Sequence, residues 1–414
     1  MSSIKSPGSN VTLLFFAQSL GGASPPIIIS LGGIVGQMLS TNPALVTLPV
    51  SLYNLGLALS TIPAALLMRR AGRRSAYLMG ASFGMASGLV AGLGIFMADF
   101  MLFCLGTAMA GFYGACVQSY RFAATEGLPS SAHGQAISRV MLGGLLAAVI
   151  GPQVVIWTRD AIPSAPFAGS FFGQAALALL VIPLLLRMRP AQSPTIATPP
   201  APGGRASAQT TGHDDGLAAR PLSEIASSPR FIVAVASGVV TYGLMSFVMT
   251  AAPIAMVGCG HTIGEAALGI QWHVLAMFGP SFFTGRLIKR FGKYRITMVG
   301  LALTACSALT ALAGLDLLNF WGSLVLLGIG WNFGFIGATA MVTDCYRPSE
   351  RNKVQALNDF LVFGTVAIAS FSSGRLLTLS GWDTINTALL PIVAALIVLI
   401  ATMARRDSRM RVGA

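Results

Sequence analysis

Long hydrophobic runs, separated by short polar or charged segments, extend over almost the whole chain. Twelve runs can be distinguished, each of about 20 residues or more, which is enough for a helix to cross the ~30 Å hydrocarbon core of a bilayer. The pattern predicts an all-α polytopic membrane protein with twelve transmembrane helices. The first run is too long for the apolar core of a cleaved signal peptide, so we expect none. The predicted spans are 11–38, 45–68, 75–97, 100–122, 135–157, 167–187, 230–256, 264–289, 295–314, 318–343, 354–378 and 384–404.

The composition supports a membrane protein and indicates two helical bundles joined by a linker. Of the 414 residues, 54% are hydrophobic and 9% are charged, whereas a soluble domain carries roughly 25% charged residues. Residues 191–228 are rich in proline, alanine, glycine, serine and threonine and contain no apolar run, which predicts a flexible linker. We therefore expect an N-terminal six-helix bundle over 1–190, the linker over 191–228, and a C-terminal six-helix bundle with a basic tail over 229–414.

The formal net charge of +13 describes topology and does not indicate a nucleic-acid partner. The basic residues gather in the even-numbered loops and in the C-terminal tail, at 69–74, 187–189, 289–295, 347–353 and 405–411. Because lysine and arginine are enriched in cytoplasmic loops, this distribution predicts that both termini and the linker are cytoplasmic.

The two halves of the chain repeat with an offset of 220 residues. Residues 65–74 align with 285–294, and both segments are basic with a glycine at the same place. Residues 135–139 align with 355–359 at the same offset. Two matches at one offset, on corresponding helices, indicate an internal duplication.

A six-plus-six plan with a basic, glycine-containing loop after the second helix of each half resembles the major facilitator superfamily. The resemblance implies two six-helix bundles that rock around a central binding site between inward-open and outward-open states. The loop departs from the usual pattern, because Arg69 and Lys289 stand where an aspartate is customary. Arg139 and Asp359 occupy equivalent places in the repeat, either as a pair across the bundles or as two separate solvated charges.

Two residue pairs are the candidate metal ligands: Met245 with Met249, and His273 with Met277. Each pair has the i, i+4 spacing that places both side chains on one helix face. At 1.5 Å rise per residue, all four fall within a slab of ~10 Å near the middle of the membrane. Thioether and imidazole donors without carboxylates favour Cu(I). The alternative is that the methionines pack in the core and that a neutral histidine bonds a neighbouring helix.

These pairs also resemble the motif of the CcoA-type family of bacterial copper importers. The resemblance implies a multi-pass protein of the bacterial inner membrane that imports copper, as Cu(I), for assembly of a cbb3-type oxidase. Copper would then be the transported substrate and the bilayer the surroundings. No resident cofactor is expected, and the protein is expected to be a monomer.

Further candidates lie outside this set. Met256, Cys259 and His261 would form an external relay that captures the ion, or else belong to an ordinary glycine-rich turn. Trp331 and Asn332, in the tenth span, either line the pathway or satisfy each other.

Other functions are weighed against copper import. A major facilitator that carries or exports a small organic solute or drug is one alternative, and a copper sensor or scaffold without transport is another. Tyr120, Arg121 and Glu126 are expected to form a structural polar hinge at the end of the fourth span. The sequence has no nucleophile–base set, phosphate loop or paired intramembrane carboxylates, so we expect no enzyme.

Overall fold

The computed structural model describes residues 8–126, 128, 130–188, 220–347 and 350–412, and these residues form helices without a strand among them. The N-terminal half contains α1 (Gly8–Gly21), α2 (Ser24–Leu39), η1 (Pro43–Leu45), α3 (Leu48–Phe96), α4 (Phe100–Gln118), α5 (Tyr120–Ala123), α6 (Ser130–Thr158) and α7 (Ala168–Leu186). The C-terminal half contains α8 (Leu222–Ala226), α9 (Pro229–Gly258), α10 (Ile263–Phe278), α11 (Ser281–Phe291), α12 (Lys293–Leu312), α13 (Leu317–Thr343) and α14 (Arg351–Val412).

The helices supply the twelve membrane crossings that the hydrophobic pattern predicts. Nine stretches of the described residues are long and apolar enough to cross a bilayer. Two of them are 54 and 55 residues long and reverse direction at Gly72 and Gly381, where the backbone is not helical, so each supplies two crossings. Together, α10 and α11 supply the remaining crossing.

Two predicted spans are broken helices. The first consists of α1 and α2, and α2 begins with prolines in its first turn, where the missing amide hydrogen does no harm. The eighth consists of α10 and α11, which are separated at Gly279 and Pro280. The hydrophobic pattern cannot distinguish a broken apolar span from a continuous one, because both bury the same residues.

The internal repeat is visible in the backbone. Gly72 has φ 79° and ψ 157°, and Gly292, which lies 220 positions later, has φ 86° and ψ 150°. Only glycine adopts such angles without steric cost. The same turn is therefore built twice, which supports the duplication.

The same loops are held by equivalent ion pairs. Arg73 pairs with Glu126 in the first half, and its repeat counterpart Lys293 pairs with Asp344 in the second. In each half a basic residue after the second span is thereby tied to the end of the fourth span. Both ion pairs lie near helix ends and are partly exposed, so their contribution to stability is modest.

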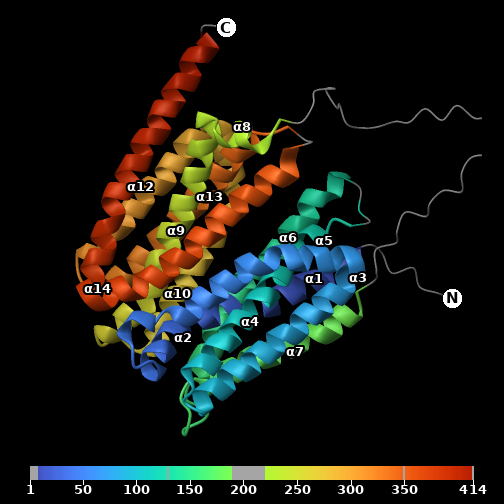
Figure 1. Cartoon of the computed structure of the whole chain (residues 1–414), viewed down its shortest axis with the longest axis vertical. Helices are drawn as coiled ribbons and strands as arrows, with labels where there is room; N and C mark the ends of the chain where they lie inside the picture. Colours follow the sequence, from blue (N-terminus) through green and yellow to red (C-terminus); the bar gives the residue numbers. More distant parts are fainter. Residues whose placement is uncertain (1–7, 127, 129, 189–219, 348–349, 413–414) are drawn as a thin grey trace, which may run out of the picture.

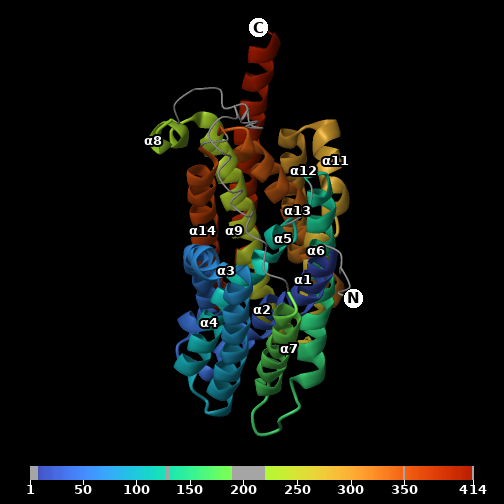
Figure 2. The same cartoon turned by 90° about the vertical axis from the view of Figure 1, so that its right-hand side faces the viewer.

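The two halves form bundles that meet near α2, α9 and α10, and their helix ends spread apart on the side of α5 and α8 (Figures 1 and 2). Polar contacts between the bundles gather at the end away from that side. There the Gln153 amide donates to Gln271 at 3.1 Å, and the Thr47 hydroxyl donates to the Phe371 carbonyl at 3.2 Å. We call this the closed end, and the other end the open end.

Glycines allow the bundles to approach closely at the closed end. A Cβ atom at Gly33 would lie 2.5 Å from the Ile254 side chain, and one at Gly374 would lie 2.4 Å from Thr47. Both distances are shorter than real Cβ contacts. A larger residue at Gly374 would therefore collide with the short Thr47 side chain, and one at Gly33 would require the Ile254 side chain to move.

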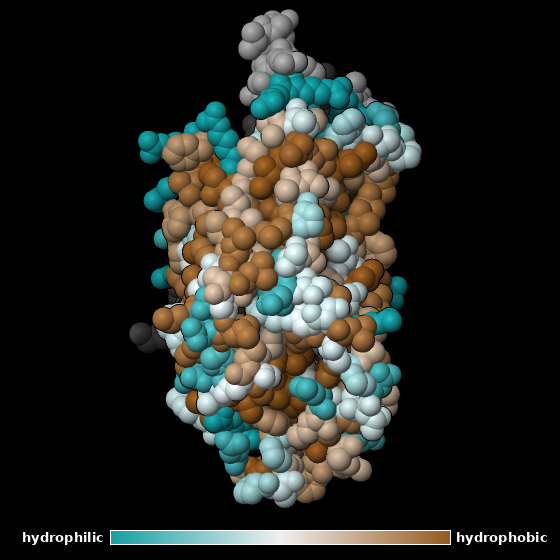
Figure 3. Space-filling view, turned by 90° about the vertical axis from the view of Figure 1, so that its left-hand side faces the viewer, coloured by the Kyte–Doolittle hydropathy of each residue, from teal (hydrophilic) through white to brown (hydrophobic). Residues whose placement is uncertain are grey.

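The upper half of one face is mostly apolar below a hydrophilic upper edge, and hydrophilic patches are interspersed with apolar residues over its lower half (Figure 3). Large hydrophobic side chains such as Leu59, Ile62 and Ile368 are more than 60% exposed. A soluble monomer rarely presents so much apolar surface, whereas a bilayer solvates it.

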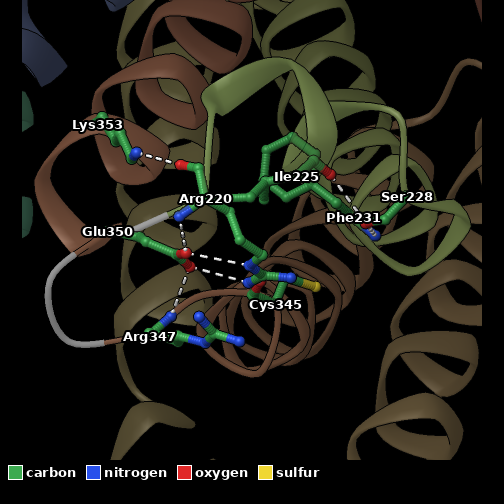
Figure 4. A network of polar contacts seen from close by, with 8 residues as sticks. All are labelled: Arg220, Ile225, Ser228, Phe231, Cys345, Arg347, Glu350 and Lys353. Atoms are coloured by element: carbon green, nitrogen blue, oxygen red, sulfur yellow. Dashed lines mark hydrogen bonds and ion pairs between the residues drawn. The ribbon is translucent and has the colours of Figure 1, made fainter. Parts of the chain in front are cut away.

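A network of polar contacts holds the C-terminal part of the predicted linker against the C-terminal bundle (Figure 4). The fully buried Glu350 carboxylate accepts from the Arg220 backbone amide at 2.8 Å and from its guanidinium at 2.8 and 3.0 Å. The Arg347 amide also donates to it, at 2.9 Å. The Arg220 guanidinium first, and then the Arg347 amide, hold the pKa of this carboxyl far below its ordinary value. We call this network the latch.

The segment after Arg220 continues the docking. Lys353 donates to the Arg220 carbonyl, Ile225 on α8 is fully buried, and the Ser228 hydroxyl accepts from the Phe231 amide to cap α9. Residues 220–228 are therefore structured and packed, although the sequence predicts a flexible linker over them. Most of that predicted linker lies outside the described residues.

Candidate functional site

Three aromatic side chains of the C-terminal half meet around a fourth, Tyr242, and the four come from three helices. The Tyr242 ring, on α9, lies edge-to-face against Trp331 at 5.2 Å and Phe335 at 5.1 Å, both on α13. It also contacts the ring of Phe363, on α14, at 5.9 Å between centroids. We call Tyr242, Trp331, Phe335 and Phe363 the aromatic cluster.

The spacing along α13 builds part of the cluster. Trp331 and Phe335 are four residues apart, so they share one helix face. Their rings are stacked, with 5.2 Å between centroids and 14° between planes. The Trp331 indole nitrogen has no hydrogen-bond partner among the described residues. The cluster thus combines a flat apolar face with one unused donor.

Asn332, next to Trp331, has a structural role. Its amide nitrogen donates to the Met277 carbonyl at 2.6 Å and to the Ser281 hydroxyl at 2.7 Å, and its oxygen accepts from Thr284 at 2.6 Å. It therefore bridges the break between α10 and α11. Trp331 and Asn332 do not satisfy each other, which was one of the two sequence-based interpretations.

Each bundle contributes one charged residue near this cluster, and the two charges are opposite in sign. Arg121, on α5 of the N-terminal half, interacts electrostatically with Asp359 on α14 and with Tyr242. Both charged side chains are exposed, and no direct ion pair joins them among the described residues. Tyr53, on α3, is also within electrostatic range of Tyr242.

These contacts change two sequence-based expectations. Asp359 has Arg121 as its electrostatic partner from the opposite bundle, and no contact with Arg139 is found among the described residues. The expected polar hinge does not form as one group. Tyr120 is fully buried, Glu126 pairs with the loop after the second span, and Arg121 interacts electrostatically with Asp359 of the other bundle.

The predicted metal ligands are all buried in the C-terminal half. Met245, Met249 and Met277 belong to one hydrophobic cluster. His273 is completely buried, and its Nδ1 is hydrogen-bonded to the Leu324 carbonyl at 2.7 Å, so the ring is directed at α13. Its Nε2 has no hydrogen-bond partner among the described residues. Metal ligation by these residues stays a prediction.

The predicted external relay does not have one shared environment. Met256 is fully buried in the core, whereas Cys259 is exposed. Nε2 of His261 is hydrogen-bonded to the Leu315 carbonyl at 2.8 Å, which fixes this loop to the next one. Partial desolvation first, and then the Asp383 carboxylate, raise the pKa of the Cys259 thiol. The role of the three residues as a relay stays a prediction.

The fold and these residues can be compared with known proteins. The chain matches the family model described as Major Facilitator Superfamily over residues 9–333 and 272–413. The chain belongs to the major facilitator superfamily. The resemblance drawn from its repeat and its basic loops is thereby confirmed at the level of the superfamily.

Relatives of this facilitator cover nearly its full length. The riboflavin transporter RfnT of Brucella anthropi (strain ATCC 49188) is 61% identical over 389 residues, which are 94% of each chain. The uncharacterized MFS-type transporter YdeG of Bacillus subtilis (strain 168) is 30% identical over 379 residues, 88% of this chain and 85% of its own. These relatives are transporters by name, as the duplicated two-bundle plan led us to expect.

A solved structure shows the same fold. The crystal structure of a single-substitution variant of the nucleoside transporter NupG superposes with a TM-score of 0.70, over 96% of this chain and 99% of that one. The two sequences are 12% identical, so the likeness concerns the fold alone.

The prediction of copper as substrate and partner is wrong. A relative with 61% identity over 94% of the chain is a riboflavin transporter, and the finer resemblance to CcoA-type importers, with its link to a cbb3-type oxidase, is not confirmed. The physical reason lies in the weakness of the motif. Methionines four residues apart on a helix also arise where they fill a core, which is where Met245 and Met249 lie.

Proposed function

We propose that this facilitator carries riboflavin across the cytoplasmic membrane by alternating access. The observation that supports this most strongly is the 61% identity to a riboflavin transporter over 94% of both chains. At that identity and coverage, the helices that line the binding site correspond one to one. The flavin ring system is large, flat and mostly apolar, so its site needs aromatic faces and a few polar groups.

The aromatic cluster has the properties that such a ring requires. Rings stacked on one another present a flat face, and stacking of a heteroaromatic base on an aromatic side chain contributes about 1–3 kcal/mol. The half-buried Phe335 ring offers this face, with the buried Trp331 ring stacked against it and Tyr242 set edge-on against both. A carrier for a metal ion would need no such surface.

The orientation of the protein in the membrane follows from the distribution of its basic residues. The basic loops and both termini would lie in the cytoplasm, so the closed end would face outward and the described state would be inward-facing. Residues 1–190 and 229–414 would move as the two bundles, joined by 191–228. Breaking the closed-end contacts while bringing the open end together would expose the site to the other side.

Growth of a riboflavin-requiring bacterium that lacks its own flavin transporter tests the proposal. We expect the intact protein to restore growth at low external riboflavin. A Tyr242→Ala/Phe335→Ala variant should fail, and Phe333→Ala, on the same helix but packed against Phe283, should succeed. Equal membrane amounts are checked by immunoblot. Failure of the intact protein, at normal membrane levels, would overturn the proposal.

A further inference from the structure

The charged residues Arg121 and Asp359 lie beside the aromatic cluster and have no direct partner in each other. We propose that they bind the polar edge of the flavin ring, with the Asp359 carboxylate accepting from the imide N–H and the Arg121 guanidinium donating to a neighbouring ring carbonyl. This inference rests on the proposed function and names the atoms that the site would recognise.

Both charged side chains are accessible, and neither is neutralised by a direct ion pair with the other among the described residues. Each comes from a different bundle, Arg121 from α5 and Asp359 from α14, and both side chains are exposed. They interact electrostatically, but no salt bridge joins them among the described residues. Two exposed charges of opposite sign, one on each bundle and without a direct ion pair between them, can be bridged by a molecule that both donates and accepts.

Both charged residues are also linked to members of the aromatic cluster. Asp359 precedes Phe363 by four residues on α14, so both lie on one helix face, with a rise of about 6 Å between them. Arg121 interacts with Tyr242, the ring at the centre of the cluster. A planar ligand stacked on the cluster would therefore direct one edge at the two charges.

The hydrogen-bonding capacity of the two side chains matches that edge. The pyrimidine part of a flavin presents a carbonyl, an N–H and a second carbonyl in a row. An ionised carboxylate only accepts and a guanidinium only donates, so the N–H suits Asp359 and a carbonyl suits Arg121. Hydrogen bonds to charged groups are about twice as strong as neutral ones.

The remaining contacts of these residues do not use up this capacity. The Asn358 amide donates to one Asp359 oxygen at 3.1 Å, which leaves the other oxygen available. The Arg121 guanidinium lies 4.8 Å from the Phe122 ring centroid, a contact that leaves its N–H donors available. A ligand edge can therefore satisfy both groups without breaking a hydrogen bond.

Competition for riboflavin uptake into proteoliposomes tests the inference. The competitors are unlabelled riboflavin and 3-methylriboflavin, which keeps the ring and the sugar chain but has lost the imide N–H. We expect the intact protein to bind the methylated compound at least about tenfold more weakly. In Asp359→Ala, affinity for riboflavin should fall by a similar factor, so that the preference for riboflavin over its methyl derivative disappears.

The controls separate recognition from folding. Asp383→Ala removes an exposed carboxylate at the closed end and should preserve both affinities. Asp359→Asn keeps the shape of the side chain, so it should reduce the preference for riboflavin over 3-methylriboflavin without abolishing riboflavin uptake. The comparison of the two compounds on the intact protein needs no variant, so a folding defect cannot obscure it.

The outcomes distinguish this inference from the function on which it rests. If the intact protein transports riboflavin but binds 3-methylriboflavin equally well, the edge assignment is wrong and riboflavin transport stands. If Asp359→Ala weakens the binding of both compounds by the same factor, so that the ratio of their affinities is unchanged, the carboxylate does not contact the polar edge of the ring. If the intact protein carries no flavin at all, both proposals are overturned.

Discussion

Replacing Trp331 with leucine removes the largest ring of the aromatic cluster and so tests whether the cluster binds substrate. Trp331 stacks on Phe335 at 5.2 Å and also contacts Tyr242 and Phe278, at 5.2 and 6.0 Å. If a flavin stacks on this surface, the loss should be about 1–3 kcal/mol of binding energy. That corresponds to roughly 5- to 150-fold weaker affinity for riboflavin.

A second buried tryptophan offers a matched control. Trp382 is 6% exposed, against 7% for Trp331, and its indole nitrogen likewise has no partner among the described residues. It packs against Phe320 at 5.2 Å, near the closed end. Both leucine variants should lower the thermal unfolding temperature by similar amounts, because each removes a similar ring from the core.

The assay is the dissociation constant of riboflavin for purified protein in detergent, measured by quenching of flavin fluorescence. Only Trp331→Leu should weaken binding. Unchanged affinity in Trp331→Leu, or an equal loss in Trp382→Leu, would show that the cluster does not bind the flavin ring.

Four other perturbations follow from the packing and the latch. Glu350→Gln should speed tryptic cleavage beside the latch. Glu224→Gln, which changes an exposed residue on α8, should not, and equal cleavage rates in the two variants would contradict the role of the latch. The pKa of Glu350 is depressed in the folded protein, so its stabilising effect is complete above the ordinary carboxyl pKa and is lost only as the pH falls towards the lower folded value. Thermal unfolding temperature should therefore show no loss from this group between pH 8 and about pH 5. Gly374→Leu should prevent the two bundles from closing at the closed end, so riboflavin uptake should fall at least about tenfold while riboflavin binding is unchanged. Gly258→Leu, at a position where a Cβ meets open space, should leave uptake intact. Asn332→Ala should lower the free energy of unfolding by about 1–3 kcal/mol, measured by denaturant titration; an unchanged midpoint would mean that its three hydrogen bonds are replaced.

The fold could be predicted from the sequence because its determinants are local and periodic. Each crossing is an apolar run, and the duplicated glycine turns at Gly72 and Gly292 lie at a fixed offset. The breaks within the first and eighth spans could not be predicted, because a broken helix keeps the same hydrophobic pattern. The docking of residues 220–228 depends on Glu350, more than 120 positions away, and no local pattern indicates it.

The site was harder to predict, because its residues come together only in the tertiary structure. Tyr242, Trp331 and Phe363 lie on three helices and share no spacing in the sequence, although Trp331 was marked as a pathway candidate. From the sequence, Arg121 is assigned to a polar hinge, and Asp359 either to a pair with Arg139 or to a separate solvated charge. The methionine and histidine pairs drew attention because their spacing is regular, and regular spacing is also how a helix builds its core.

The most direct test of riboflavin transport is uptake into proteoliposomes that contain only this purified protein. Labelled riboflavin should accumulate faster than in empty vesicles, should saturate, and should be reduced by excess unlabelled riboflavin, and copper uptake should equal that of empty vesicles. Riboflavin entry no faster than in empty vesicles, with protein shown to be folded and inserted, would contradict the account.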